Sequence, residues 1–385
     1  ISFVINSTNV GQNIVVGLQL KLIVKGHGNY TDTKETITTA VTKKVITTSD
    51  INFNLGDKTI DKVYDGNNGV EASDLSSATA SIYASSLAAN DSVVLTVGNG
   101  TYNNENAGSP KAVTINLTAS GTHAGNYEVT TYSTTGVITK KALTITPNAY
   151  QTTYGDKVTP TLYSNTALVS GETITITLVS SKDNTTSVGV YNSAISVNTV
   201  TIIKSNNDIS TDNYNITTNT STHTIIAKEI TLDNITVNPS TVTKVYDGNN
   251  LVTESFTYTL TTVSRDNSNS SDGRAITGDS ITITTVSAIY DTETVGDNKV
   301  VTITLGKEGT HAGNYVIPGF TTITGSITKF ELATSDLDIS EISKTYDGNT
   351  TATVTTFKVK TTSLQNQSDV VTLTVVSATY DNKNA

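Results

Sequence analysis

Several short stretches of the chain alternate between apolar and small polar residues. The pattern is clearest at residues 113–118, 174–178 and 301–305, where Val, Ile or Leu alternates with Thr or Asn. Neighbouring residues of a β-strand point to opposite faces, so this pattern predicts strands that are buried on one face. Several such strands in every 90–100 residues, separated by Asn, Asp, Gly and Ser, predict an all-β fold of tandem antiparallel β-sandwiches.

Two short motifs recur between these strands. The first, Lys-x-Tyr-Asp-Gly-Asn, comprises Lys62, Tyr64, Asp65, Gly66 and Asn67, then Lys244, Tyr246, Asp247, Gly248 and Asn249, then Lys344, Tyr346, Asp347, Gly348 and Asn349, with Tyr154, Gly155 and Asp156 as a variant. The second ends in Asn-Tyr and comprises His27, Asn29 and Tyr30, then His123, Asn126 and Tyr127, then Asn213 and Tyr214, then His311, Asn314 and Tyr315. Both motifs return about every 90–100 residues, which predicts a tandem repeat.

Local backbone chemistry suggests a structural role for both motifs. Asp65-Gly66 after a short strand predicts a tight hairpin turn, because such turns need positive φ at their central residues. Lys62 and Tyr64 lie two residues apart and should share one face, with the ring at the edge of the core. In the second motif, Gly and Asn permit a bend, and the Tyr ring is expected to be buried with its hydroxyl bonded to the backbone.

The boundaries between repeats lack flexible linkers. At residues 41–47, 138–144, 226–231 and 327–332 one strand pattern continues into the next, without a Gly/Ser-rich or Pro-rich spacer. We therefore expect an elongated rod. Its expected parts are an N-terminal segment (1–44, half a repeat), a first repeat (45–140), a second repeat (141–228), a third repeat (229–329) and a C-terminal segment (330–385, half a repeat). Flanking repeats of a longer chain are the expected partners of the two halves.

Composition limits the classes of partner. The 385 residues carry a net charge of −10, so the chain lacks the basic surplus that binds nucleic acid or anionic lipid. There is no cysteine, which excludes disulfides and thiolate metal sites. No apolar run approaches the length of a membrane span, so we expect no membrane insertion in this segment.

Catalysis is not expected. Three of the four histidines travel with the Asn-Tyr motif, one per repeat, and the natural interpretation is a hydrogen bond that stabilises the turn. A hydrolase and an ice-binding face of Thr-x-Thr rows are weaker alternatives, and glycosylation at the Asn-x-Thr sequences stays open.

The sequence leaves two other kinds of site open. No cofactor is expected, but calcium is an alternative, since Asp57, Asp61, Asp65 and Asp91 lie close in sequence, as do Asp272, Asp279, Asp291 and Asp297. An amide crosslink between Lys62 and Asn126, and between Lys244 and Asn314, is a second alternative, and it would need a buried neutral amine.

These motifs resemble the YDG repeat of large bacterial surface proteins, including filamentous-haemagglutinin-like adhesins. Residues 142–156, ALTITPNAYQTTYGD, resemble the companion mostly bacterial immunoglobulin-like (MBG) repeat. The resemblance implies immunoglobulin-like sandwiches, secretion to the bacterial cell surface and a stalk that carries an adhesive tip. It implies no catalytic residues. The second repeat departs from the pattern, because Thr152 stands where the other repeats have Lys.

The functional expectation is a structural stalk of a secreted adhesin that supports cell attachment and biofilm. The alternative is that the repeats themselves bind glycan, a host protein or identical chains, the last through an exposed edge strand. The low aromatic content and the absence of Trp disfavour repeated sugar-stacking surfaces.

Overall fold

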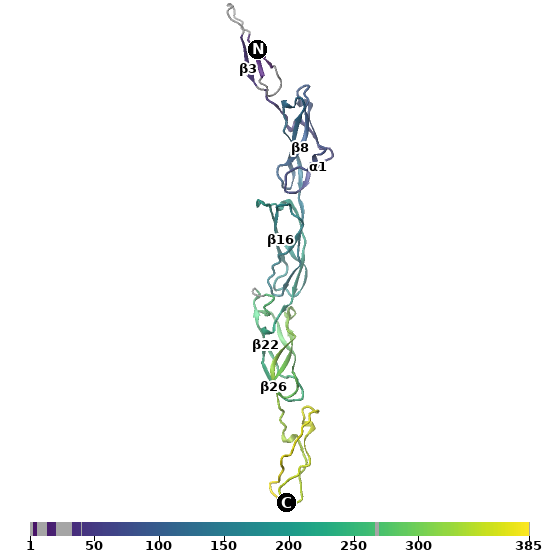
Figure 1. The fold of residues 1–385 in the computed structure, drawn as a ribbon, viewed down its shortest axis with the longest axis vertical. Helices are drawn as coiled ribbons and strands as arrows, with labels where there is room; N and C mark the ends of the chain where they lie inside the picture. The colour runs from purple at the N-terminus through teal and green to yellow at the C-terminus, as the bar shows by residue number, and fades with distance from the viewer. Residues whose placement is uncertain (1–2, 6–13, 21–32, 40, 266–268, 385) are drawn as a thin grey trace, which may run out of the picture. The chain divides into compact units, whose positions relative to one another are not determined.

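The computed structural model describes residues 3–5, 14–20, 33–39, 41–265 and 269–384. Strands are the main regular secondary structure of these residues, as Figure 1 shows. The chain divides into two compact units. Unit 1 comprises Ile1–Pro147, Thr161–Leu178 and Ser196–Thr220, and unit 2 comprises Asn148–Pro160, Val179–Ile195 and Ser221–Ala385. The second repeat contributes strands to both.

Unit 1 is built from strands and very short helical turns. Its strands are β1 (Phe3–Ile5), β2 (Ile14–Leu20), β3 (Thr33–Thr39), β4 (Lys44–Val45), β5 (Ile51–Asn54), β6 (Asp61–Val63), β7 (Thr79–Ile82), β8 (Val94–Tyr102), β9 (Gly108–Ser120), β10 (Tyr127–Glu128), β11 (Thr131–Thr139), β12 (Lys141–Pro147), β14 (Tyr163–Asn165) and β17 (Tyr214–Thr218). Its helical turns are α1 (Ala72–Leu75), η1 (Thr48–Asp50), η2 (Ala84–Ser86), η3 (Ala124–Asn126) and η4 (Thr211–Asn213). β15 (Thr173–Ser180) and β16 (Gly189–Ile203) have residues in both units.

Unit 2 has the same character. Its strands are β13 (Tyr150–Thr153), β18 (Ser221–Ile226), β19 (Lys228–Glu229), β20 (Ile235–Asn238), β21 (Thr241–Val245), β22 (Thr257–Leu260), β23 (Thr262–Val263), β24 (Ala275–Ile276), β25 (Thr282–Tyr290), β26 (Gly296–Glu308), β27 (Tyr315–Val316), β28 (Phe320–Thr328), β29 (Leu337–Ile339) and β30 (Phe357–Val359). Its 3-10 turns are η5 (Leu232–Asn234), η7 (Ala312–Asn314), η8 (Thr334–Asp336) and η9 (Thr361–Ser363). The described chain is therefore all-β, as the alternation predicts.

The predicted alternation is confirmed in the long strands. In β9, Val113, Ile115 and Leu117 are buried while the residues between them are exposed. In β26, Val301, Ile303 and Leu305 are buried, separated by half-buried threonines. The two strands hold equivalent places in four-stranded sheets with the orders β6-β11-β9-β8 and β21-β28-β26-β25.

Strand direction differs from the prediction of purely antiparallel sheets. The first strand of each four-stranded sheet runs parallel to the last strand of the same repeat, as β6 does beside β11 and β21 beside β28. β12 and β17 are also parallel, as are β13 and β18. Such pairs join segments far apart in the sequence, and their pattern of inward and outward residues is the same for either direction.

A hydrophobic core continues from one repeat into the next inside each unit. In unit 1 the core joins Tyr64 and Tyr127 of the first repeat to Leu143, Ile145 and Tyr214 of the second. In unit 2 it joins Tyr154 and Ile225 of the second repeat to residues of the third, among them Tyr315. Only Lys140 separates β11 from β12, and only Ala227 separates β18 from β19, so these two boundaries run strand to strand as predicted. After β28 the expected continuation is wrong, because residues 329–333 form no strand.

Candidate functional site

The Lys-x-Tyr-Asp-Gly-Asn motif folds into a closed loop after β6. Lys62 is nearly buried, and its Nζ lies 2.8 Å from Asp65 Oδ1 and 2.8 Å from Asn67 Oδ1. Asp65 Oδ1 accepts the Asn67 amide at 3.0 Å, and Asn67 Oδ1 accepts the Gly69 amide at 2.9 Å. One ammonium thus holds two side chains that in turn satisfy the turn backbone.

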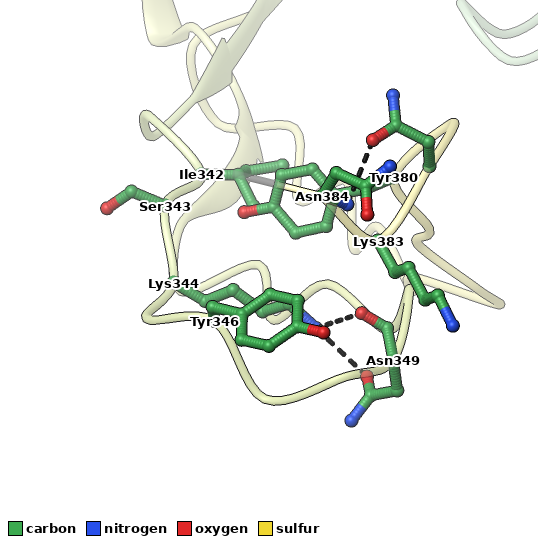
Figure 2. A pocket seen from close by; sticks show the side chains of 9 residues that line it. Ile342, Ser343, Lys344, Tyr346, Asn349, Tyr380, Lys383 and Asn384 are labelled. Carbon is green, nitrogen blue, oxygen red and sulfur yellow. Dashed lines mark hydrogen bonds between the residues drawn. The ribbon is translucent and has the colours of Figure 1, made fainter.

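The same loop recurs twice. Lys244 Nζ lies 2.6 Å from Asp247 Oδ1 and 3.1 Å from Asn249 Oδ1. Lys344 Nζ lies 2.8 Å from Asp347 Oδ1. It also lies 2.9 Å from Asn349 Oδ1, a contact that Figure 2 shows. Burial alone would raise the pKa of Asp65 and of Asp247, but hydrogen bonds from the lysine and from the following Asn hold both pKa values below the ordinary range.

The prediction of a hairpin turn at Asp-Gly is wrong. Gly66, Gly248 and Gly348 do have positive φ, at 82°, 78° and 83°, but the preceding Asp residues do not. The chain after Gly66 does not return along β6, whose partner is the parallel strand β11; it crosses to bridge Gly69 to Thr101. The side chains that the lysine holds supply the turn hydrogen bonds that a hairpin would have taken from the backbone.

The tyrosine of the first motif bonds to a carboxylate of the second repeat. Tyr64 is 1% exposed, and its hydroxyl donates to Glu172 Oε1 at 2.6 Å. The Tyr214 hydroxyl donates to the other oxygen of Glu172 and accepts the Val169 amide at 2.9 Å. The Tyr64 and Tyr214 rings meet edge to face, with centroids 5.7 Å apart. All these residues lie in unit 1.

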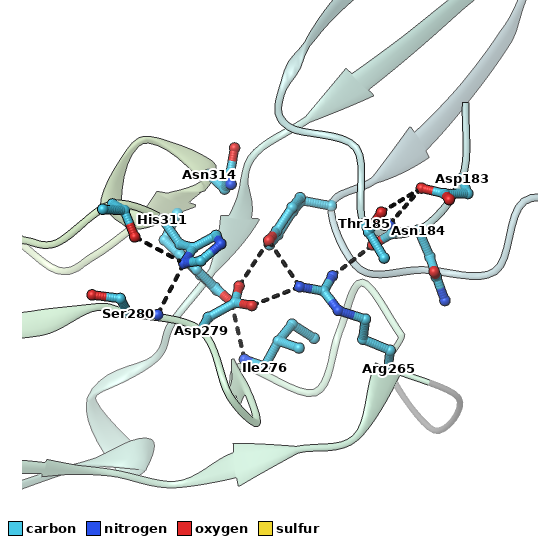
Figure 3. Close-up of polar contacts among 12 residues, drawn as sticks. Asp183, Asn184, Thr185, Arg265, Ile276, Asp279, Ser280, His311 and Asn314 are labelled. Atoms are coloured by element: carbon cyan, nitrogen blue, oxygen red, sulfur yellow. Dashed lines mark hydrogen bonds and ion pairs between the residues drawn. The ribbon is translucent and has the colours of Figure 1, made fainter. Parts of the chain in front are cut away.

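The variant motif of the second repeat makes the same contact with the third repeat, inside unit 2. Asp279 Oδ2 accepts the Tyr154 hydroxyl at 2.8 Å and the Tyr315 hydroxyl at 2.6 Å, and the rings meet edge to face at 5.6 Å. Arg265 adds a cation, with its guanidinium 2.6 Å from Asp279 Oδ1 and 3.0 Å from the Tyr154 hydroxyl (Figure 3). Tyr315 also accepts the Ile276 amide at 3.0 Å.

The third contact is simpler. Tyr246 donates to both oxygens of Asp369 in the C-terminal segment, at 3.0 and 2.8 Å. Three successive boundaries thus carry a tyrosine of one repeat on a carboxylate of the next. We call these the tyrosine–carboxylate joints: Tyr64–Glu172, Tyr154–Asp279 and Tyr246–Asp369.

Burial and the carboxylates set the acidity of these phenols. Burial first, then the hydrogen bond to Glu172, raises the pKa of both Tyr64 and Tyr214 above the ordinary value. Burial and Asp279 raise the pKa of Tyr315 in the same way. The tyrosines are therefore neutral donors across the physiological range, and they give the joints charge-assisted hydrogen bonds without adding a charge of their own.

The Asn-Tyr motif forms the reverse contact. Asn213 Oδ1 accepts the amide of Ala107 in the first repeat at 2.9 Å, and Asn314 Oδ1 accepts the amide of Val188 in the second repeat at 3.0 Å. The tyrosine hydroxyls accept backbone amides, as predicted, and Tyr127 also donates to Asp91 at 2.8 Å. At the first two joints, therefore, the earlier repeat donates a tyrosine hydroxyl to an acid of the later repeat, and also donates a backbone amide to the asparagine of the later repeat.

The glycine of the first motif lets the repeats approach closely. A Cβ at Gly66 would lie 2.8 Å from Val169 Cγ1, and one at Gly248 would lie 2.7 Å from the Gln365 carbonyl oxygen. No real Cβ occupies such positions, so glycine is required here for contact as well as for its positive φ.

Three histidines occupy structural positions. His123 Nδ1 accepts the Ser92 amide and His311 Nδ1 accepts the Ser280 amide, both at 3.0 Å, which confirms the predicted turn-stabilising bond. His223 is fully buried in the second repeat, where Nε2 lies 2.8 Å from Thr152 Oγ1 and Nδ1 lies 2.9 Å from Ser180 Oγ. Burial lowers the pKa of His223. In the second repeat Thr152 thus takes the motif position that lysine has in the other repeats, and it contacts His223, which in turn contacts Ser180.

The calcium site and the amide crosslink are the other two candidate kinds of chemistry. Asp65, Asp272, Asp279 and Asp291 pair with Lys62, Lys228, Arg265 and Lys299 respectively. In the part of the chain that the structure describes, no group of three or more acidic or histidine side chains is placed to hold a metal. Lys62 and Lys244 are ion-paired within their own motifs, which opposes the neutral amine that an amide crosslink needs. His27, Asn29 and Tyr30 lie outside the described residues.

Sequence reasoning missed the carboxylates of the joints. The sequence pattern presents Asp279 only as a candidate calcium ligand, together with Asp91, which bonds to Tyr127 inside the first repeat, and it gives no reason to single out Glu172 or Asp369. One signal was available, since each of these acids stands just before a strand pattern that carries alternating apolar residues. Their spacing from the tyrosine motifs varies, so a fixed-period search does not find them.

Comparison with known proteins agrees with the motifs. The family model described as the YDG domain matches residues 42–136, 228–325 and 331–385, which is more than half of the chain. The chain belongs to the YDG domain family. No curated protein matches it. Among solved structures, the extracellular domain of protocadherin GammaB4 aligns at 9% identity and a TM-score of 0.21; the alignment covers 83% of this chain and 56% of that one, so this chain spans little more than half of it. The helices within the described ranges are all too short or too polar for a transmembrane segment.

Proposed function

We propose that this YDG domain chain is a structural stalk of a secreted bacterial surface adhesin. Its repeats would be immunoglobulin-like sandwiches with the boundaries given above, the second being of the MBG type, joined so that orientation passes from one to the next. The role would be mechanical and non-enzymatic, supporting an adhesive tip in cell attachment and biofilm. Flanking repeats of the same longer chain would be its main partners.

The tyrosine–carboxylate joints carry this proposal. A flexible string of domains needs only a linker, whereas here a tyrosine hydroxyl of one repeat bonds to a carboxylate of the next at each of the three joints. At the first and third joints the motif glycine also makes a close contact with the next repeat. Each hydrogen bond to a carboxylate contributes about 1.5–3 kcal/mol. The apolar core that continues past each of the first two joints adds to this resistance against bending.

The non-enzymatic role is supported by the positions of the histidines. His123 and His311 each accept a backbone amide, and His223 is buried between two hydroxyls. His123 Nε2 lies 3.7 Å from Asp91 Oδ1, but its Nδ1 receives a backbone amide and not a serine hydroxyl, and among the described residues the ring of His223 contacts two hydroxyls and no carboxylate. Neither arrangement is that of a Ser-His-Asp hydrolase.

Small-angle scattering on the intact chain tests the stalk. For the unaltered chain we expect a maximum dimension that only repeats arranged end to end can give. For the double variant Glu172→Ala, Asp279→Ala we expect scattering that indicates a more flexible chain. A compact particle, or equal flexibility in both proteins, would refute the stalk. Surface labelling of the cells that make the protein tests its location, and a purely intracellular signal would refute secretion.

A further inference from the structure

The second repeat carries a histidine at a place where the first and third repeats have glycine. His223 lies on β18 and pairs with Tyr150, two positions before the strand partner of Thr152. The matching positions of β11 and β28 are Gly136 and Gly325, since each stands two positions before the strand partner of the motif lysine. Among these three repeats the histidine is therefore peculiar to the second.

In the first and third repeats the glycine makes room for a tyrosine ring. A Cβ at Gly136 would lie 2.9 Å from Cε1 of Tyr102, and a Cβ at Gly325 would lie 2.6 Å from Cε1 of Tyr290. Burial raises the pKa of both tyrosines, so neither changes its charge near neutral pH. In the second repeat the ring at this position is an imidazole, whose ordinary pKa is about 6.5. The second repeat thus has a group that can gain a charge where the other two do not.

The contacts of His223 suit its neutral form. The ring is fully buried, with Nε2 beside the hydroxyl of Thr152 and Nδ1 beside that of Ser180. A neutral imidazole has one donor and one acceptor, and a hydroxyl can serve either. The Ser180 oxygen also accepts the Lys182 amide at 3.0 Å, which fixes its position. Both ring nitrogens are therefore satisfied without a charge.

The charged and titratable groups around the ring supply no counter-ion. Tyr150 of β13 packs against it with ring centroids 5.2 Å apart, and Tyr191 of β16 is its strand partner on the other side. The Nζ of Lys182 lies 4.8 Å from the centre of the Tyr191 ring, so the charge on this side is positive. Within the described residues, the contacts of His223 include no carboxylate. A second proton would create a buried charge without a partner.

His223 is connected to the second joint through the pairing of β13 with β18. Thr152 lies on β13 two residues before Tyr154, whose hydroxyl donates to Asp279. The Tyr154 amide donates to the carbonyl of Ile226, the last residue of β18, at 2.8 Å. The bond between Thr152 and His223 thus links the two strands directly beside the tyrosine of the joint.

We propose that protonation of His223 at mildly acidic pH loosens the second joint. The ring takes a proton from solvent on the nitrogen that was the acceptor. The pairing of β13 with β18 then opens, and Tyr154 is no longer held at Asp279. The first joint has no such response, because its motif position holds Lys62, which is ion-paired with Asp65. The inference concerns the chemistry of one joint and does not rest on the stalk role.

The direction of the pH effect follows from burial. Burial lowers the pKa of His223, so an imidazole exposed by opening binds a proton more readily than the buried ring does. The strand pairing is therefore fully stable above about pH 6.5 and weakens as pH falls toward the lower pKa of the buried ring. Ordinary carboxyl groups have a pKa near 4, so they stay charged in the range from about pH 7 to pH 5.

Hydrogen–deuterium exchange of the intact chain from about pH 7 to pH 5, corrected for the intrinsic pH dependence of exchange, tests the proposal. We expect protection of the amides of β13, β18 and Tyr154 to fall by up to about tenfold per pH unit below about pH 6.5. The Ile276 amide, which donates to Tyr315 within the joint, should lose protection with them. The Tyr64 amide, at the same place in the first repeat, should keep its protection. Unchanged protection in β13 and β18, an equal fall at Tyr64, or full protection at Ile276 would overturn the proposal.

Two variants and one further measurement separate His223 from other acid effects. His223→Gln keeps a donor and an acceptor but cannot take the proton, so protection of β13 and β18 should no longer depend on pH. His123→Gln, at a half-buried histidine of the first repeat, is the matched control and should leave that dependence unchanged. An NMR titration of the histidine rings in the unaltered chain does not depend on the stability of either variant. An equal pH response in His223→Gln, or a His223 ring that titrates at or above about pH 6.5, would refute the inference.

Discussion

Replacing Tyr64 with Phe removes one oxygen atom and leaves the ring of the first joint in place. The lost bond is 2.6 Å long and its acceptor is the carboxylate of Glu172. Tyr64 is only 1% exposed, so water cannot readily take the place of the hydroxyl. Hydrogen bonds to charged groups contribute about 1.5–3 kcal/mol. We expect the free energy of unfolding of the first repeat to fall by about that amount.

Urea denaturation followed by circular dichroism measures this loss. A chain of several repeats need not unfold in one step. The unfolding step to compare between the two proteins is therefore the one whose urea midpoint Tyr64→Phe lowers. The matched control is Tyr346→Phe, the same position of the same motif, where the tyrosine residue is 62% exposed. We expect that variant to change stability by less than about 0.5 kcal/mol. Equal effects at the two positions would refute the claim that the tyrosine acts through the carboxylate.

Alkaline pH extends the test, because the folded-state pKa of Tyr64 is raised above its unfolded value near 10. The contribution of the joint is present below about pH 10 and is lost as pH rises toward the folded pKa. Tyr64→Phe should show a weaker loss of stability over this range than the unaltered chain, measured by urea titration at each pH. An identical pH dependence would contradict the assignment.

Three further predictions follow from other contacts. Gly248 and Gly348 both have a positive φ, but a Cβ at 248 would lie 2.7 Å from a backbone carbonyl oxygen, whereas a Cβ at 348 would meet no atom within 4 Å. Gly348→Ala should therefore lower the free energy of unfolding by about 1 kcal/mol in urea denaturation, and Gly248→Ala should lower it clearly more. Thr152→Val leaves buried His223 without one partner and should cost about 1–3 kcal/mol, with equal stability of the two proteins as the contrary result. The lowered pKa of Asp65 means that its contribution is present above about pH 4 and lost as pH falls, so Lys62→Met should flatten the acid limb of a stability–pH curve.

The sequence was most informative where the structure depends on neighbouring residues. Alternation of Val, Ile and Leu with Thr is a local property, and it correctly predicts β9 and β26 with the right residues inward. His123 was correctly assigned to its turn because it recurs with that turn. The positive φ of Gly66 was expected for the same local reason.

What the sequence did not predict depends on residues distant along the chain. β6 and β11 pair in parallel although some 70 residues separate them, and alternation is the same for either direction. Glu172 binds Tyr64 across 108 positions and is a single polar residue without a motif of its own. The core that passes from the first repeat into the second was also hidden, because a strand pattern does not reveal which neighbour covers its face.

The division of each joint between two repeats has a consequence for how such chains change in length. Each repeat carries a tyrosine that contacts the next repeat and an acid that contacts the preceding one. When a whole repeat is inserted or removed, both partners of the tyrosine–carboxylate hydrogen bond are therefore already present. After the gain or loss of a whole repeat, a tyrosine again faces an acid at the new boundary. Length can therefore vary by duplication while the chemistry at every seam stays the same.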